Sequence, residues 1–224
     1  MRVRAFIFDL DGTIVDSMPL HDEAWVECHR RRGMSFDTAG FFERSAGRTI
    51  EEILVMEMPC ATDAERAEYC EEKEAVFREL ALERLQYIAG FEAFHVQARA
   101  RGIVMAIGTA APLRNVQVAY DRLGLNQLIS VIASPADGLR GKPEPDIFLS
   151  CAQQLGVDAA ECLVFEDAPL GIEAARRAGM RAVALTTTLG SDAFAAYPNR
   201  IATASNFDEL DRHALFNNSY LFDS

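Results

Sequence analysis

Short runs of apolar residues recur along the chain, and most of them contain no alternating polar positions. Continuous runs of this kind are typical of strands that are buried on both faces of a parallel sheet. They predict strands over 4–8, 103–108, 130–133, 162–166 and 181–185, with helices between the later ones over 113–123, 145–155 and 169–178. Strand–helix alternation in this order favours an α/β fold with a doubly wound, mainly parallel, Rossmann-like core.

One long interval interrupts the alternation. From about Asp16 to Gln86 the chain has no strongly apolar strand, but it has charge-rich helical segments, of which 66–85 is the clearest. A connection of about 70 residues is far longer than an ordinary strand–helix connection. We therefore expect an all-helical cap domain over 16–87, inserted into a core domain formed by 1–15 and 88–224.

Composition and charge narrow the class of protein. Half of the 224 residues are apolar and a quarter are charged, as in ordinary soluble proteins. The net charge of −12 argues against a nucleic-acid or membrane partner, and the longest uncharged stretch in the middle of the chain, 102–113, is too short to span a bilayer. The five cysteines show no CxxC spacing. We expect a cytoplasmic protein with free thiols, a monomer or weak homo-oligomer.

Candidate chemistry begins where the first predicted strand ends, in FIFDLDGTIVDS. Asp9 and Asp11 follow this strand, Thr109 ends the second, and Glu166 and Asp167 end the fourth. Ligands of open α/β sheets bind beyond the carboxyl ends of the strands, so these side chains are expected to share one rim. Carboxylates that converge without histidine or cysteine indicate a site for a hard cation, with Mg²⁺ the expected ion.

Each feature also has a simpler explanation when it is taken alone. A DxD pair at a strand end can cap a turn, and Asp167 stands in the N-cap position before Ala168 and Pro169. Lys142, in a loop before a predicted helix, means little by itself. Their joint placement at successive strand ends favours a catalytic site.

Four segments together resemble the motifs of the haloacid-dehalogenase-like phosphotransferases, in the same order along the chain. They are DLDGTIVDS, AIGTAAP, GKPEPDIF and VFEDAPLGIEAA. The resemblance covers nearly the whole chain. The insertion directly after the first motif, and its segment MPLHDEAW, are similar to the helical cap of the β-phosphoglucomutase-like branch.

The resemblance implies a role for each motif residue. Asp9 would be the nucleophile that forms an aspartyl-phosphate, and Asp11 the general acid and base. Mg²⁺ would be held by Asp9, the backbone carbonyl of Asp11 and Asp167, with Glu166 acting through water. The remaining core residues would bind the transferring phosphoryl group or lie close to it: Thr109, Lys142, Gly12 and Ala110.

Substrate selection is expected from the cap. His21 and Trp25 share a helix face, either as a buried aromatic pair or with His21 controlling Asp11 or contacting a sugar while Trp25 packs at the hinge. Lys73 lies on the apolar stripe of the long cap helix, where it either extends to solvent or reaches the cleft. The other acidic and arginine residues of this helix are typical of a solvated face.

The segment GRTIEEIL offers a possible anion site. Thr49 and Glu52 have the spacing of a capping box, so a helix is expected to begin there, with Gly47 and Arg48 just before it. A helix N-terminus beside an arginine suits a phosphate or a polar sugar. The alternative is an ordinary capped surface helix, since Glu52 would itself occupy that terminus.

The same aspartyl-phosphate can be discharged to water or to a sugar hydroxyl. The β-phosphoglucomutases carry an arginine three positions after the glycine of the cap loop, where this chain has Ile50, and AAPLRN lacks their serine–lysine pair. We therefore expect a Mg²⁺-dependent phosphatase of small phosphorylated metabolites, in particular sugar phosphates; the alternative is a β-phosphoglucomutase-type phosphohexomutase. A non-enzymatic binding protein would be expected to have lost Asp9, Asp11 or Lys142.

Overall fold

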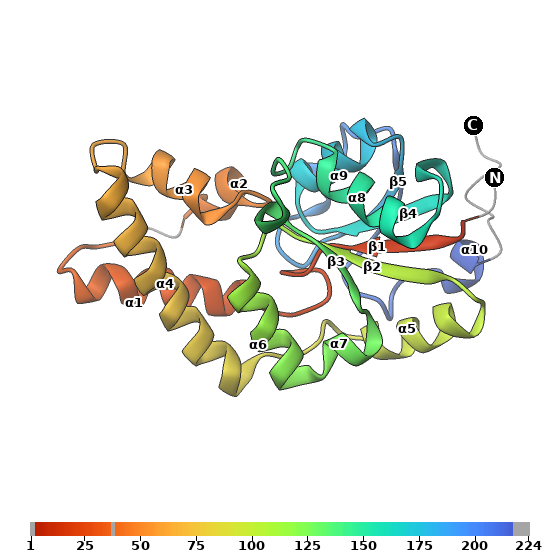
Figure 1. Ribbon diagram of the computed structural model, residues 1–224, viewed down its shortest axis with the longest axis horizontal. Coiled ribbons are helices and arrows are strands. Elements are labelled where there is room, and N and C mark those ends of the chain that lie inside the picture. Colours follow the sequence, from red (N-terminus) through yellow and green to blue (C-terminus); the bar gives the residue numbers. More distant parts are fainter. Residues whose placement is uncertain (1–2, 37–38, 217–224) are drawn as a thin grey trace.

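A computed structural model describes residues 3–36 and 39–216 (Figure 1). The strands are β1 (Ala5–Phe8), β2 (Val104–Gly108), β3 (Val131–Ala133), β4 (Cys162–Glu166), β5 (Arg181–Leu185) and β6 (Arg200–Ala204). The α-helices are α1 (Met18–Arg31), α2 (Phe41–Ser45), α3 (Ile50–Glu57), α4 (Asp63–Arg84), α5 (Phe91–Ala100), α6 (Leu113–Leu123), α7 (Leu125–Leu128), α8 (Asp146–Leu155), α9 (Pro169–Arg177) and α10 (Arg212–Phe216). Short 3₁₀ helices are η1 (Pro135–Asp137), η2 (Ala159–Glu161) and η3 (Ser191–Phe194). Of the helices described, none has both the length and the apolar character needed to cross a bilayer.

The strands of the described residues form one parallel sheet in the order β3-β2-β1-β4-β5-β6. The five predicted strands are confirmed to within one residue at their ends, as are the helices α6, α8 and α9. The sixth strand, β6, was not predicted: it is an edge strand whose residues are mostly half-buried, so it lacks a continuous apolar run. The chain order reverses at β1, which has β2 on one side and β4 on the other.

Side chains of β1 alternate between two apolar layers, one on each face of the sheet. Phe6 and Phe8 point into the layer that contains α5 and α6, where Phe8 stacks on Phe165 with ring centroids 4.8 Å apart. Ala5 and Ile7 point into the layer that contains α8 and α9. Figure 1 shows these helix pairs on opposite faces of the sheet. Burial on both faces is why the strand reads as an unbroken apolar run.

The helices α1 to α4 follow β1 directly and lie to one side of the sheet (Figure 1). They enclose an apolar cluster of their own, formed by Trp25, Cys28, Phe41, Ile50, Leu54 and Tyr69. The second half of α4 packs differently, because Phe77 and Ala81 belong to the same cluster as α5 and α6 of the core. In its described residues the insertion forms helices and no strand, and α4 connects it to the core.

The two passages of chain between the sheet and these helices lie side by side. Val15 and Tyr87 form an antiparallel bridge. On either side of it the Asp16 amide donates to the Gln86 carbonyl and the Ile88 amide to the Ile14 carbonyl, each at 2.9 Å. The helical insertion therefore leaves and returns to the core at one hydrogen-bonded point.

Phe94 of α5 tests the aromatic layer. It is fully buried and lies 5.1–5.5 Å, centroid to centroid, from Phe6, Phe165 and Phe207. Phe94→Ala is expected to lower the free energy of unfolding by about 3–5 kcal/mol, because it leaves a cavity in a packed layer. Val96 on the same helix is 63% exposed, so Val96→Ala should change the free energy of unfolding by less than about 0.5 kcal/mol. Denaturant titration measures both, and equal losses would contradict this assignment of the core.

Candidate active site

Acidic and hydroxyl side chains gather at the carboxyl ends of three neighbouring strands. Asp9 follows β1, Thr109 follows β2 and Asp167 follows β4, and the sheet order places β1 between the other two. All three residues are buried, and they line a cavity of about 110 Å³ whose other walls come from the helical insertion. The structure thus brings the motif residues together, while their chemical roles stay predictions.

Lys142 is buried beside Asp9, in the loop before α8. Its ammonium donates hydrogen bonds to Asp9 and, at 2.7 Å, to Glu166 Oε1. The other oxygen of Glu166 accepts the Ala168 amide at 2.6 Å. Burial opposes the charged form of Lys142, but the charges of Asp9 and Glu166 outweigh it and raise its pKa, so the side chain stays a cation. Burial, together with the charges of Glu166 and Asp167, raises the pKa of Asp9.

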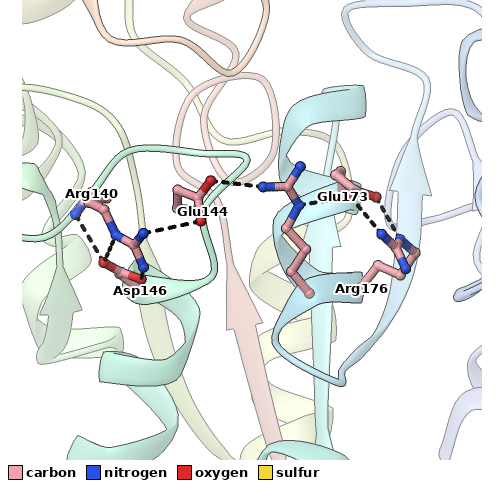
Figure 2. Close-up of polar contacts among 6 residues, drawn as sticks. Arg140, Glu144, Asp146, Glu173 and Arg176 are labelled. Carbon is pink, nitrogen blue, oxygen red and sulfur yellow. Dashed lines mark hydrogen bonds and ion pairs between the residues drawn. The ribbon is translucent and has the colours of Figure 1, made fainter.

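Ion pairs on the surface fix the loop that carries Lys142 (Figure 2). Arg140 donates two hydrogen bonds of 2.7 Å to Asp146 of α8 and lies 3.5 Å from Glu144. Glu144 in turn accepts from Arg177 of α9 at 2.8 Å. A single exposed pair contributes little to stability, but this series connects the loop to the two helices on the same face of the sheet.

Asp167 is held by two threonines that the sequence did not single out. Its carboxylate accepts hydrogen bonds from Thr13, at 3.0 Å, and from Thr188. The interpretation of Asp167 as the N-cap of α9 is wrong, because Ala168 is the N-cap residue and the carboxylate points to the threonines instead. Burial and the neighbouring charge of Glu166 raise the pKa of Asp167 to about 7. The only sequence signal for Thr188 is its place just after a predicted strand.

Gly12 lets the backbone pass directly beside Asp167. Its φ of +73° lies in the left-handed region, and a Cβ there would stand 2.2 Å from Asp167 Oδ2 and 2.7 Å from Thr188 Oγ1. A side chain at this position would therefore meet both a backbone penalty and a clash. Gly12 acts by leaving space for Asp167.

The residues present fit a divalent cation beside Asp9 and Asp167. Burial and the neighbouring acids raise the pKa of both carboxylates, which disfavours their charged forms. A cation bound between them would stabilise the two charged carboxylates. Within the described part of the chain, no three acidic, histidine or cysteine side chains form a metal cluster. Side chains supply two carboxylates, and the backbone carbonyl of Asp11 is the third oxygen that the motif offers. Such an all-oxygen donor set suits Mg²⁺.

Asp11 faces the helical insertion. Its Oδ1 accepts a hydrogen bond from Ser17 Oγ at 2.7 Å and lies 3.6 Å from His21 Nε2. Burial opposes ionisation, but His21 and Ser17 outweigh it and hold the pKa of Asp11 below its usual value. Without substrate, Asp11 is therefore a carboxylate that can act as a base. The negative charge of a phosphate beside it would raise its pKa, as the acid role requires.

His21 of α1 connects Asp11 to α4. Its Nδ1 lies 2.7 Å from Lys73 Nζ, and because an ammonium only donates hydrogen bonds, this contact leaves the ring proton on Nε2, which faces Asp11. The ring stacks on Phe77, with centroids 3.8 Å apart. Trp25 packs in the apolar cluster of the insertion. Lys73 is 2% exposed and lines the cavity, so it does not extend to solvent.

Two residues that were not predicted from the sequence complete this wall, Glu74 and Asn115. Glu74 Oε1 accepts from Lys73 Nζ at 2.9 Å and Oε2 accepts from Asn115 Nδ2 at 2.5 Å, which joins α4 to the first turn of α6. Burial opposes the charge of Glu74, but Lys73 outweighs it and the pKa is lowered. The assignment of Glu74 to a solvated face is therefore wrong. Its spacing of three residues from Phe77, on the same stripe, was the available signal.

The loop before α3 contributes Gly47 and Arg48 to the cavity. The predicted capping box is confirmed: Thr49 Oγ1 accepts from the Glu52 amide at 3.3 Å, and Glu52 Oε2 accepts from the Thr49 amide at 3.0 Å. Because Glu52 occupies this helix terminus, the anion-site interpretation depends on Arg48 alone. Arg48 Nε donates to the backbone carbonyl of Arg44 at 3.1 Å.

Most of the predicted substrate-contacting residues line the cavity. They are Ala110, His21, Trp25, Gly47, Arg48 and Lys73. Gly12 and Thr49 are not among the lining residues, since Gly12 lies against Asp167 and Thr49 caps α3. Direct contact of the six residues with substrate stays a prediction.

Comparisons with known proteins agree with this geometry. A family model described as haloacid dehalogenase-like hydrolase matches residues 3–179. The validoxylamine A 7'-phosphate phosphatase of Streptomyces hygroscopicus subsp. limoneus is 31% identical over 84% of this chain and 88% of its own. The fructose-1-phosphate phosphatase of Escherichia coli K12 is 32% identical over 81% of this chain and 96% of its own.

A solved structure extends the likeness to the whole fold. The β-phosphoglucomutase of Clostridium difficile superposes with a TM-score of 0.83 at 25% identity, covering 99% of this chain and 100% of its own. The arrangement of sheet and helical insertion is therefore similar to that of a phosphate-transferring enzyme.

Gly12→Ala tests the close approach to Asp167. Gly102 provides a matched control, because it has the same φ of +73° but a Cβ added there would have no atom within 4 Å. Gly102→Ala should lower the free energy of unfolding by about 1–2 kcal/mol, the cost of a left-handed backbone alone. Gly12→Ala should cost at least about 2 kcal/mol more, because Asp167 must move. Equal losses in denaturant titrations would show that the close approach is unimportant.

Proposed function

The chain belongs to the haloacid dehalogenase-like hydrolase family, and from this premise we propose that it is a Mg²⁺-dependent phosphatase of small phosphorylated metabolites, in particular sugar phosphates. One observation carries the proposal: Asp9 lies beside the buried cation Lys142, at the end of β1, in a cavity that α1 and α4 also line. The two phosphatases described above, each similar to this chain, support the reaction type.

In the first step the Asp9 carboxylate attacks phosphorus, and the bond to the leaving oxygen breaks. This forms an aspartyl-phosphate on Asp9, and Asp11 gives its proton to the departing alcohol. Lys142 stabilises the charge of the phosphoryl oxygens. Thr109 Oγ1 accepts the Ala111 amide at 3.0 Å, which leaves its hydroxyl proton available to a phosphoryl oxygen.

In the second step Asp11, now a carboxylate, takes a proton from water as that water attacks the phosphorus. The bond to Asp9 breaks, inorganic phosphate leaves, and both aspartates return to their starting states. Residues of the helical insertion line the cavity, and a closed insertion would exclude bulk water from the intermediate.

Asp9, Asp167 and the carbonyl of Asp11 are the groups that would hold Mg²⁺. When bound, the ion neutralises charge on the transferring phosphoryl group. Glu166 would reach the ion only through water, and it also fixes Lys142, from which it accepts a hydrogen bond of 2.7 Å. Thr13 and Thr188 orient the Asp167 carboxylate.

The phosphomutase alternative is favoured by one observation, the presence of Arg48 in the cavity. A mutase has to bind the non-reacting phosphate of a bisphosphate, so it needs cations away from Asp9. Here Ile50 takes the place of the arginine found in the β-phosphoglucomutases, and Arg114 is 73% exposed and pairs with Glu71 at 2.8 Å. These features support hydrolysis over transfer to a second hydroxyl.

We further propose that the cap domain spans 16–87 and opens about the paired linkers at Val15 and Tyr87 to admit substrate. A cytoplasmic location is supported by the five cysteines, all of which are free thiols. The charge of −12 supports a small metabolite as the partner, rather than a nucleic acid or a membrane, for a monomer or weak homo-oligomer.

A substrate panel tests the function. We expect Mg²⁺-dependent phosphate release from hexose, hexitol or pentose monophosphates, lost on chelation with EDTA and restored by Mg²⁺. In parallel, β-glucose 1-phosphate is assayed for conversion to the 6-phosphate, with and without glucose 1,6-bisphosphate. Isomerisation stimulated by the bisphosphate, with little phosphate release, would replace the phosphatase by the mutase.

Asp9→Asn tests the nucleophile. The substitution should lower kcat by at least about 10³-fold, because the amide cannot form the aspartyl-phosphate. Asp63→Asn provides a control: it removes a carboxylate that is fully exposed and pairs with Arg66 at the start of α4, and it should leave kcat within about twofold. Far-UV circular dichroism should show both variants folded. Wild-type kcat in Asp9→Asn would contradict the assignment.

A further inference from the structure

The wall that α4 presents to the cavity carries a compensated pair of charges. Lys73 and Glu74 both line the cavity and are 2% and 4% exposed. The ammonium of Lys73 donates to Glu74 Oε1 at 2.9 Å. A substrate in the cavity therefore lies near the Lys73 ammonium and the Glu74 carboxylate together.

Glu74 is held as a carboxylate and in one place. Lys73 lies on one of its oxygens and the Asn115 amide on the other, at 2.5 Å. Burial opposes the charge, yet these neighbours lower the pKa of Glu74. Since Lys73 belongs to α4 and Asn115 to α6, the carboxylate is fixed from two helices.

The remaining charges of the cavity leave little attraction for a second anion. Lys142 is taken by Asp9 and Glu166, and it lies at the reacting centre. Away from that centre, and among the described residues, Arg48 is the lining cation for which no carboxylate contact is found. A second phosphate would thus meet one arginine and the Glu74 carboxylate, whereas hydroxyl groups can donate hydrogen bonds to Glu74.

We propose that Glu74 is a specificity-determining residue, which makes the cavity accept phosphomonoesters with a neutral, hydroxylated leaving group and reject those that carry a second phosphate. This inference rests on the proposed phosphatase function and adds the chemistry of the leaving group. Rejection follows because like charges brought close together in a buried site repel strongly, and the Lys73 charge that would attract a phosphate is already neutralised.

The test compares two substrates of one sugar: the hexose monophosphate that the panel shows to be hydrolysed fastest, and the bisphosphate of the same hexose. In the wild type, kcat/KM for phosphate release should be at least about tenfold higher for the monophosphate. Glu74→Gln keeps the size of the side chain and can still accept from Asn115, but it leaves Lys73 uncompensated. The preference should then fall by about tenfold.

Glu79→Gln is the matched control. Glu79 lies on the same helix, its substitution removes the same charge, and the residue is exposed. The preference of this variant should equal that of the wild type. Any effect of Glu74 on Asp11 acts on both substrates, so it cancels in the ratio.

The outcomes separate the two proposals. If no monophosphate is hydrolysed, the phosphatase function fails and this inference with it. If monophosphates are hydrolysed but the wild type accepts the bisphosphate equally well, or Glu74→Gln keeps the wild-type preference, only the role of Glu74 is overturned. A wild-type ratio near one overturns the role of Glu74 even if Glu74→Gln does not fold.

Discussion

The buried ammonium of Lys142 is the interaction on which the site depends. Asp9, Glu166 and Asp167 are all buried at the ends of adjacent strands, and their mutual repulsion would force protonation without a cation. Lys142 lies between the first two and is bonded to both. Removing one partner of such a buried pair is strongly destabilising, because the other charge is left uncompensated. The fold therefore has to deliver the loop of Lys142 to β1 and β4, and the packing of α8 and α9 on that face does so.

The parts of the fold that could be predicted from the sequence are those in which burial alone determines the residue pattern. The strands β1 to β5 are buried on both faces, so composition alone reveals them, and Asp9 and Asp167 follow at their ends. The edge strand β6 and the helix α5 were missed, because each is only partly buried and its pattern is mixed. Thr188 and Glu74 were missed for a different reason: their roles arise from contacts with residues far along the chain, which spacing does not encode.

Polar contacts connect the core to the helical insertion and back to the core. Asp11 lies beside His21, His21 accepts from Lys73, and Lys73 donates to Glu74, which ends on Asn115 of α6. Opening of the insertion has to break this series at Asp11 or at Asn115. The pKa of Asp11 depends on His21, so the position of the insertion and the proton affinity of the proposed acid–base residue are physically linked. Closure can thereby prepare the base at the moment when bulk water is excluded.

The same contacts explain how a protein with a charge of −12 can bind an anion. Surface acids do not reach the cavity, and many are paired locally, as Glu173 is with Arg176 and Arg177. The attraction therefore has to come from a few buried groups whose charges are already partly compensated. A phosphoryl group can bind where it takes over the contact of Lys142 with Asp9, whereas at Lys73 the Glu74 carboxylate is also held by Asn115. In the proposed function, affinity for phosphate is therefore highest beside Asp9, where the chemistry would occur.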